Sequence, residues 1–214
     1  MNLPQRYTPP APLPVRRVRR REYKQTHPGF LHPLIQTIIQ VKNSEDGRGV
    51  FVFTGPARAV GVTYVVQVVA RELAAETQSR VLIVSSTTLD GASDQDLRRA
   101  SHGAVECASG VWSLVDQENV EYLPDVLLER VWVDVERSDF DFVLIDCPAV
   151  TEAGDALRLA PEADGVFLIV GAGETTRDQV EQAQRVLRYA SGHLRGIVLN
   201  RRTYPVPKFL YKLI

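Results

Sequence analysis

The stretch GVFVFTGPARAVGVTYVVQVVARELA, residues 49–74, decides the fold of this chain. It opens with Val50–Thr54, an apolar run that is typical of a strand buried on both faces. A short loop containing Gly55 and Gly61 follows, and Val62–Glu76 has the apolar period of a helix. A buried strand that leads through such a loop into a helix is an arrangement in which backbone amides bind phosphate. The stretch therefore predicts a phosphate loop.

The rest of the chain repeats the alternation of strands and helices. Four further buried strands are expected: Val81–Val84, Val143–Asp146, Val166–Val170 and Ile197–Asn200. Longer helices are expected at Leu34–Val41, Asp125–Arg137 and Arg177–Tyr189. Shorter elements are expected as helices at Asp94–Ala100 and Val111–Val115 and as a strand at Val120–Leu123. This order predicts a three-layer α/β fold of the P-loop NTPase type, with a mainly parallel sheet and helices on both faces.

Length and composition indicate one domain with two tails. The chain has 214 residues, 44% of them hydrophobic and 24% charged, which suits one globular core. We expect a disordered Pro- and Arg-rich arm over residues 1–30, the P-loop domain over residues 31–203, and a tail over residues 204–214. No apolar run is long enough for a membrane span, and Cys107 and Cys147 form no metal or disulfide pattern. A cytoplasmic protein is the expectation.

The phosphate loop departs from the pattern G-x-x-x-x-G-K-[ST] at two positions. Gly61 and Thr63 fit, but Val62 stands where the lysine belongs and Pro56 stands where the first glycine belongs. The strand FVLID, residues 142–146, ends in Asp146, as a magnesium-holding strand beside such a loop does. Thr63 and Asp146 are therefore candidate magnesium ligands. A helix-capping Thr63 and a turn-forming Asp146 are the structural alternatives, and Asp155 is expected as a helix N-cap.

With these motifs, the chain resembles the cytoplasmic kinase domain of bacterial tyrosine kinases that accompany polysaccharide export. That family lies within the MinD/ParA-like group of P-loop ATPases. The resemblance spans residues 34–203. The loop and helix of residues 55–74 carry it together with the following motifs in order: FDFVLIDCPA at 140–149, GDA at 154–156, ADGV at 163–166, GETTR at 173–177 and GIVLN at 196–200.

The resemblance also makes the differences informative. In the family, a loop lysine neutralises phosphates, an Asp-x-Asp motif ends the second strand, and a tyrosine cluster near the C-terminus is autophosphorylated. Here Val62 replaces the lysine, the second strand ends in Ser85-Ser86-Thr87, and only Tyr204 and Tyr211 remain in the tail. Losing one preorganised electrostatic group that stabilises the transition state typically slows catalysis about 10²–10³-fold. We therefore expect an inactive relative and assign no catalytic residue.

The resemblance implies a set of ligand-binding residues. The nucleotide set is Gly55, Arg58, Gly61, Thr63 and Asn200, and the magnesium set is Thr63 and Asp146. Arg58 is included because its charge can partly replace the missing lysine, although a solvent-facing Arg58 is the alternative. Asn200 matches a strand-end residue near the base, with a structural amide as the alternative. We expect ATP and Mg²⁺ to bind weakly or not at all.

Three functional hypotheses follow. The first is a degenerate tyrosine-kinase-like protein that regulates or scaffolds exopolysaccharide or capsule synthesis. Its expected partners are a membrane chain-length regulator (a polysaccharide co-polymerase) or an active homologous kinase, with a homo-oligomer also open. The second is an active tyrosine autokinase with an atypical loop, and the third is a ParA/MinD-like positioning ATPase. The motifs after Asp146 favour the kinase hypotheses over the third.

The N-terminal arm is strongly basic, whereas the rest of the chain is acidic. Residues 1–24 contain six arginines and one lysine against one glutamate, although the whole chain has a net charge of −1. Such an arm suits an anionic partner, namely a lipid surface, an acidic protein face or, less favoured, nucleic acid; a solvated leader is the alternative. With residues 15–24 on an anionic lipid, the protein would lie peripherally at the inner membrane.

If the arm binds anionic lipid, binding of the intact protein to anionic vesicles should weaken as salt is added, because salt screens exposed charges. Vesicle co-sedimentation at increasing NaCl concentration measures this. Binding that does not respond to salt would contradict the electrostatic role of the arm.

Overall fold

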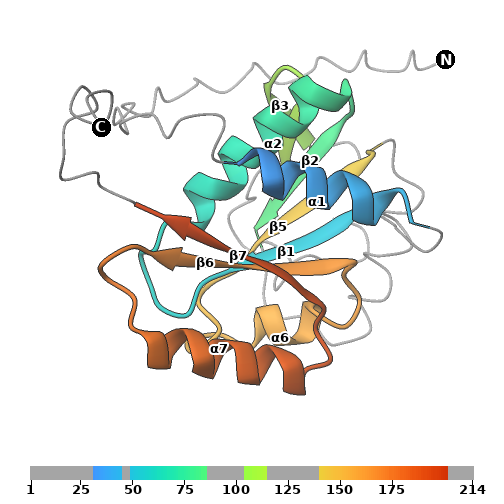
Figure 1. The fold of residues 1–214 in the computed structure, drawn as a ribbon. Coiled ribbons are helices and arrows are strands. Elements are labelled where there is room, and N and C mark those ends of the chain that lie inside the picture. The colour runs from blue at the N-terminus through green and yellow to red at the C-terminus, as the bar shows by residue number, and fades with distance from the viewer. Residues whose placement is uncertain (1–30, 45–48, 86–103, 115–139, 202–214) are drawn as a thin grey trace, which may run out of the picture.

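The computed structural model describes residues 31–44, 49–85, 104–114 and 140–201, and these form one α/β layer structure (Figure 1). The described strands make one seven-stranded sheet in the order β3-β4-β2-β5-β1-β6-β7. Their bounds are β1 Val50–Thr54, β2 Val81–Ser85, β3 Ala104–Ala108, β4 Val111–Leu114, β5 Phe142–Asp146, β6 Gly165–Gly171 and β7 Leu194–Asn200. All neighbouring strands pair in parallel except β3 and β4.

Helices cover both faces of the sheet, as Figure 1 shows. The described helices are α1 His32–Lys42, α2 Val62–Thr77, α6 Asp155–Leu159 and α7 Arg177–Tyr189. Helices α1 and α2 lie on one face, and α6 and α7 lie on the other. The fold expected from the sequence, a mainly parallel sheet between two helical layers, is confirmed.

Strand β1 explains why each face has its own core. Successive side chains of a strand point to opposite faces. Phe51 and Phe53 therefore pack with α1 and α2, whereas Val50 and Val52 pack in the second cluster with α6 and α7. All five residues of β1 are buried. Because β1 lies between β5 and β6, its carboxyl end opens into the phosphate loop at the middle of the sheet.

The five strands expected from the sequence are all present, and the helices at α1, α2 and α7 agree within two residues. The short helix expected at Val111–Val115 is wrong, because Val111–Leu114 is strand β4. It forms a hairpin with β3 across Ser109 and Gly110, and the φ of +74° at Gly110 suits so tight a turn. Four residues are too few for periodicity to separate a helix from a strand.

The N-cap expected at Asp155 is wrong by one position. Gly154 is the N-cap of α6, and Asp155 is the first helical residue, where its carboxylate accepts a 3.2 Å hydrogen bond from Arg158. The elements expected at Asp94–Ala100, Val120–Leu123 and Asp125–Arg137 lie outside the described residues, as do the arm over residues 1–30 and the tail over residues 204–214. None of the helices in the described part has the length and apolar character that a bilayer crossing requires.

Candidate functional site

The candidate site is the loop that joins β1 to α2, where the carboxyl ends of β1, β5, β6 and β7 lie together. In parallel sheets, ligands bind in the crevice beyond this edge. The loop runs over residues 55–61 and contains three of the predicted site residues, Gly55, Arg58 and Gly61. The N-terminus of α2, a helix of 16 residues, lies directly behind it.

Thr63 and Asp146, the two predicted magnesium ligands, lie next to each other at this edge. Asp146 ends β5 and Thr63 is the second residue of α2, and their side chains are hydrogen-bonded. Burial raises the pKa of the Asp146 carboxyl above its usual value, and the bond from Thr63 partly offsets that rise. A hydroxyl beside a strand-end carboxylate is a suitable pair of oxygens for Mg²⁺. Their role as metal ligands remains a prediction.

Val62, at the lysine position, is turned toward the interior. Its side chain is half-buried and packs against the apolar cluster beneath α1 and α2. A lysine at the start of α2 would carry an ammonium group toward a phosphate held by the loop. The valine instead adds apolar contact to the core and contributes no charge.

Asn200 holds the loop from the side of β7. Its side-chain amide donates a 2.8 Å hydrogen bond to the carbonyl oxygen of Val60, and the residue is buried. Gly61 has a φ of +90°, and a Cβ there would overlap the Asn200 amide nitrogen. Only glycine therefore fits at this position. The contact gives Asn200 the structural role that was the alternative, while a contact with a base stays a prediction.

The segment after β5 holds the other side of the loop. Residues 147–151 are joined to β1 and to the start of the loop by four hydrogen bonds. These are Cys147 N–H to the Phe53 carbonyl (2.9 Å), Val150 N–H to the Gly55 carbonyl (3.0 Å), the Thr54 hydroxyl to the Pro148 carbonyl (2.6 Å) and the Thr151 hydroxyl to the Pro56 carbonyl (3.2 Å). Each such bond contributes about 0.5–1.5 kcal/mol net, so this side of the loop is firmly attached.

Arg58 is less available to a phosphate than the sequence suggested. Its guanidinium forms an ion pair with Glu152, and its side chain is 80% exposed. The sequence analysis missed Glu152, because a charge six residues after a strand-end aspartate forms no motif. Exposed ion pairs contribute little stability, so the pair orients Arg58 rather than fixing the loop.

Arg201 is a second cation that the sequence analysis missed. It directly follows Asn200, and its guanidinium forms a 2.6 Å ion pair with Glu174. Its Nε lies 4.0 Å from the position of a Cβ built on Gly61, which places it beside the loop. The only available signal was its position next to Asn200. Within the described residues, no group of three or more His, Cys, Asp or Glu side chains is arranged to hold a metal.

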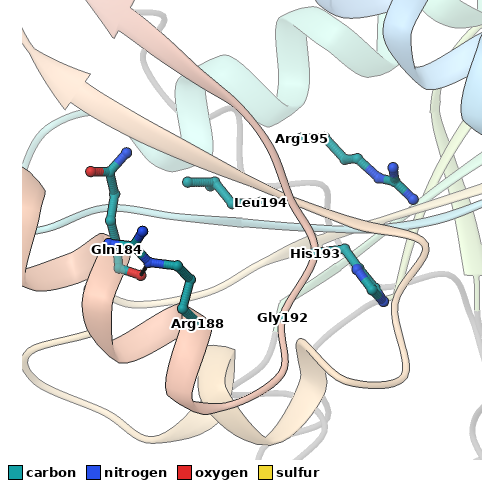
Figure 2. A pocket seen from close by; sticks show the side chains of 6 residues that line it. All are labelled: Gln184, Arg188, Gly192, His193, Leu194 and Arg195. Carbon is teal, nitrogen blue, oxygen red and sulfur yellow. Dashed lines mark hydrogen bonds between the residues drawn. The ribbon is translucent and has the colours of Figure 1, made fainter.

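A hollow of about 370 Å³ lies at the opposite edge of the sheet, by the first residues of β7. Figure 2 shows its lining: Gln184 and Arg188 project from α7, whereas His193 and Arg195 lie on the other side of the β7 backbone. These polar side chains do not converge on one point. The hollow therefore lacks the focused donors of a ligand site, and the loop remains the candidate.

Comparison with known proteins agrees with this geometry. Over 120 residues, the chain is 28% identical to the tyrosine-protein kinase CpsD of Streptococcus agalactiae, covering 53% of this chain and 52% of CpsD. Over 185 residues, it is 25% identical to the putative tyrosine-protein kinase EpsB of Ralstonia solanacearum, covering 78% of this chain and 24% of EpsB. This chain is a relative of the bacterial tyrosine kinases. It spans about half the length of CpsD and a quarter of EpsB.

Solved structures share its fold. The BceF tyrosine kinase domain superposes with a TM-score of 0.56 at 24% identity, covering 78% of this chain and 72% of that domain. The MinD cell division protein of Aquifex aeolicus has a TM-score of 0.56 at 17% identity, covering 72% of this chain and 70% of MinD. No family model matches the chain. This kinase relative thus has the P-loop fold that tyrosine kinase domains share with MinD.

Ala59 generates a stability prediction within the loop. Its φ of +59° is left-handed, a conformation that costs residues with a Cβ about 1–2 kcal/mol, and its side chain is exposed. Ala59→Gly should therefore raise the free energy of unfolding by up to about 1 kcal/mol. Urea unfolding followed by circular dichroism measures this change. Ala57→Gly, in the same loop but without a positive φ, should lower stability; equal effects of the two variants would contradict the strain at Ala59.

Asp146 generates a prediction about pH. Because its folded pKa is raised, the neutral carboxyl is the form that the fold favours, and ionisation makes the folded state less stable. Relative to Asp146→Asn, the wild type should lose stability as the pH rises from about 3.8 through the folded pKa, and the difference should then stay constant. Urea unfolding of both proteins between pH 3.5 and 8 tests this.

Thr63→Val provides the matched control for that measurement. It removes the hydrogen bond that favours the charged carboxylate, so the loss of stability with rising pH should be larger than in the wild type. Parallel stability profiles for the wild type and Asp146→Asn would show that the carboxyl is not destabilised by burial.

Proposed function

We propose that this chain is a degenerate tyrosine-kinase-like protein that works through protein contacts rather than through phosphoryl transfer. One observation carries the proposal: the first turn of α2 has a half-buried Val62, packed against the core, where a P-loop presents its lysine. Beside it, the hydroxyl of Thr63 is hydrogen-bonded to the carboxyl of Asp146. The proposed phosphate site thus has its loop and this pair but lacks its main positive charge.

The second strand supports the same proposal. Ser85 ends β2 and is the register partner of Asp146 on β5, so its side chain lies at the edge where the resemblance leads us to expect a carboxylate. Loss of one preorganised charge costs about 3–4 kcal/mol of transition-state stabilisation, and losses within one unit do not simply add. Loss of the lysine together with the carboxylates leaves too little stabilisation for useful turnover.

The role that remains is that of a regulatory or scaffolding subunit in exopolysaccharide or capsule synthesis. The expected partner is a membrane chain-length regulator or an active homologous kinase, and the protein would act in the cytoplasm at the inner membrane. Support comes from the relation to bacterial tyrosine kinases and from the basic residues 15–24, which suit an anionic surface. ATP and Mg²⁺ would bind weakly, through backbone amides and the Thr63–Asp146 pair.

A second candidate is an active tyrosine autokinase, which the retained hydrogen bond between Thr63 and Asp146 favours. A positioning ATPase is the third candidate, because the backbone fold is similar to that of MinD. Both of these candidates require ATP turnover, which needs cations around the transferred phosphate. The missing lysine charge at the loop therefore favours the first candidate over them.

Titration of the intact protein with Mg-ATP, together with an autophosphorylation assay, tests the proposal. We expect weak or undetectable binding and no phosphotyrosine. Val62→Lys should tighten Mg-ATP binding, because the ammonium group restores charge at the phosphates, but it should not restore transfer, because Ser85 brings no carboxylate.

Val62→Met controls for the loss of valine packing, since it lengthens the side chain without adding charge. Equal affinities of the lysine and methionine variants would show that the missing positive charge is not the cause of weak Mg-ATP binding. Micromolar binding by the unmodified protein, with phosphate incorporated at Tyr204 or Tyr211, would replace the proposal with the active autokinase.

A further inference from the structure

Arg201 lies closer to the helix end of the phosphate loop than its position in the sequence suggests. It follows β7 directly, and its φ of +59° turns the backbone at the end of that strand. Its Nε lies 4.0 Å from a Cβ built on Gly61, the residue that precedes Val62 and α2. A guanidinium thus stands beside the turn whose own lysine is missing.

The two arginines near the loop differ in position. Arg58 leans out to Glu152 and is 80% exposed, whereas Arg201 is 42% exposed and lies against the end of the loop that leads into α2. Backbone amides at a helix N-terminus bind phosphate. A cation that is to assist these amides must lie at the α2 end of the loop. Arg201 meets that condition, and Arg58, committed to the segment after β5, does not.

Glu174 is the ion-pair partner of Arg201 in this position. The carboxylate lies 2.6 Å from an Arg201 terminal nitrogen, and it also lies close to Gly171 at the end of β6. Both side chains are substantially exposed, so the ion pair is screened by water and contributes little. A phosphate carries more charge than a carboxylate and accepts two parallel hydrogen bonds from a guanidinium. It can therefore compete for Arg201.

We propose that Arg201 is a positioning residue for a nucleoside polyphosphate at this loop, with Glu174 as the carboxylate from which the phosphate displaces it. The inference rests on the proposed function, in which the loop amides still accept phosphate weakly. Arg201 reaches the loop from β7 and not from α2, so it supplies binding energy at a place different from that of the missing lysine. It supports binding without restoring transfer.

The test titrates the full chain and three variants with Mg-ATP, and with adenosine as a phosphate-free probe. Arg201→Gln should weaken Mg-ATP binding about tenfold, as expected for loss of a charged hydrogen bond. Glu174→Gln should strengthen it about two- to fivefold, because it frees the guanidinium and removes a negative charge. Arg188→Gln, at the opposite edge of the sheet, is the matched control and should leave the affinity unchanged.

The outcomes separate this inference from the proposed function. Equal affinities of the wild type and Arg201→Gln, or an effect of Arg188→Gln as large as that of Arg201→Gln, would overturn it. Adenosine binding that depends on Arg201 would assign the residue to the base instead. A wild type that binds no Mg-ATP would also overturn the inference while leaving the scaffolding role, which needs no nucleotide, in place. Should Arg201→Gln fail to fold, an affinity of Glu174→Gln no higher than that of the wild type would by itself refute it.

Discussion

The hydrogen bonds to the carbonyl groups of the β1–α2 turn are the constraint on which the rest of the structure depends. Buried peptide carbonyls must find hydrogen-bond donors. Here the donors come from two neighbouring directions: the segment after β5 binds the carbonyls of Phe53, Gly55 and Pro56, and Asn200 binds that of Val60. The loop can close only when the carboxyl ends of β5, β1, β6 and β7 are aligned, so the sheet and the site are formed together.

Much of the fold could be predicted because its central strands are buried on both faces. A run such as Val50–Thr54 is apolar throughout, and its alternation with amphipathic helices leaves little choice of architecture. Val111–Leu114 was mistaken for a helix because its structure is decided by pairing with the preceding Ala104–Ala108 and the more distant Val81–Ser85, both of which lie outside the four residues themselves. Propensity within four residues cannot report such a tertiary effect.

The site, too, has contacts that the sequence could predict and contacts that it could not. The Thr63–Asp146 contact was predictable, because a loop motif and a strand end converge wherever a parallel sheet forms. The bond from Asn200 to Val60 joins residues 140 positions apart, and the ion pairs of Arg58 and Arg201 depend on which exposed side chains happen to span a gap. Sequence spacing contains no information on such pairings, which are fixed by the relative placement of loops.

The charges around the loop agree with the proposal that the scaffold persists without phosphoryl transfer. Arg58 and Arg201 each already face a carboxylate, and Val62 contributes to the core instead of to the site. Asp146 is left with a hydroxyl partner and a raised pKa, so its ionisation works against folding. Phosphoryl transfer needs cations fixed around the transferred phosphate, whereas the two arginines each face a carboxylate and Val62 has no charge. The contacts that shape the turn, by contrast, are backbone carbonyls, an amide and a glycine, none of which needs a phosphate. Architecture and catalysis therefore rest on separate groups in this loop, and the first can be kept without the second.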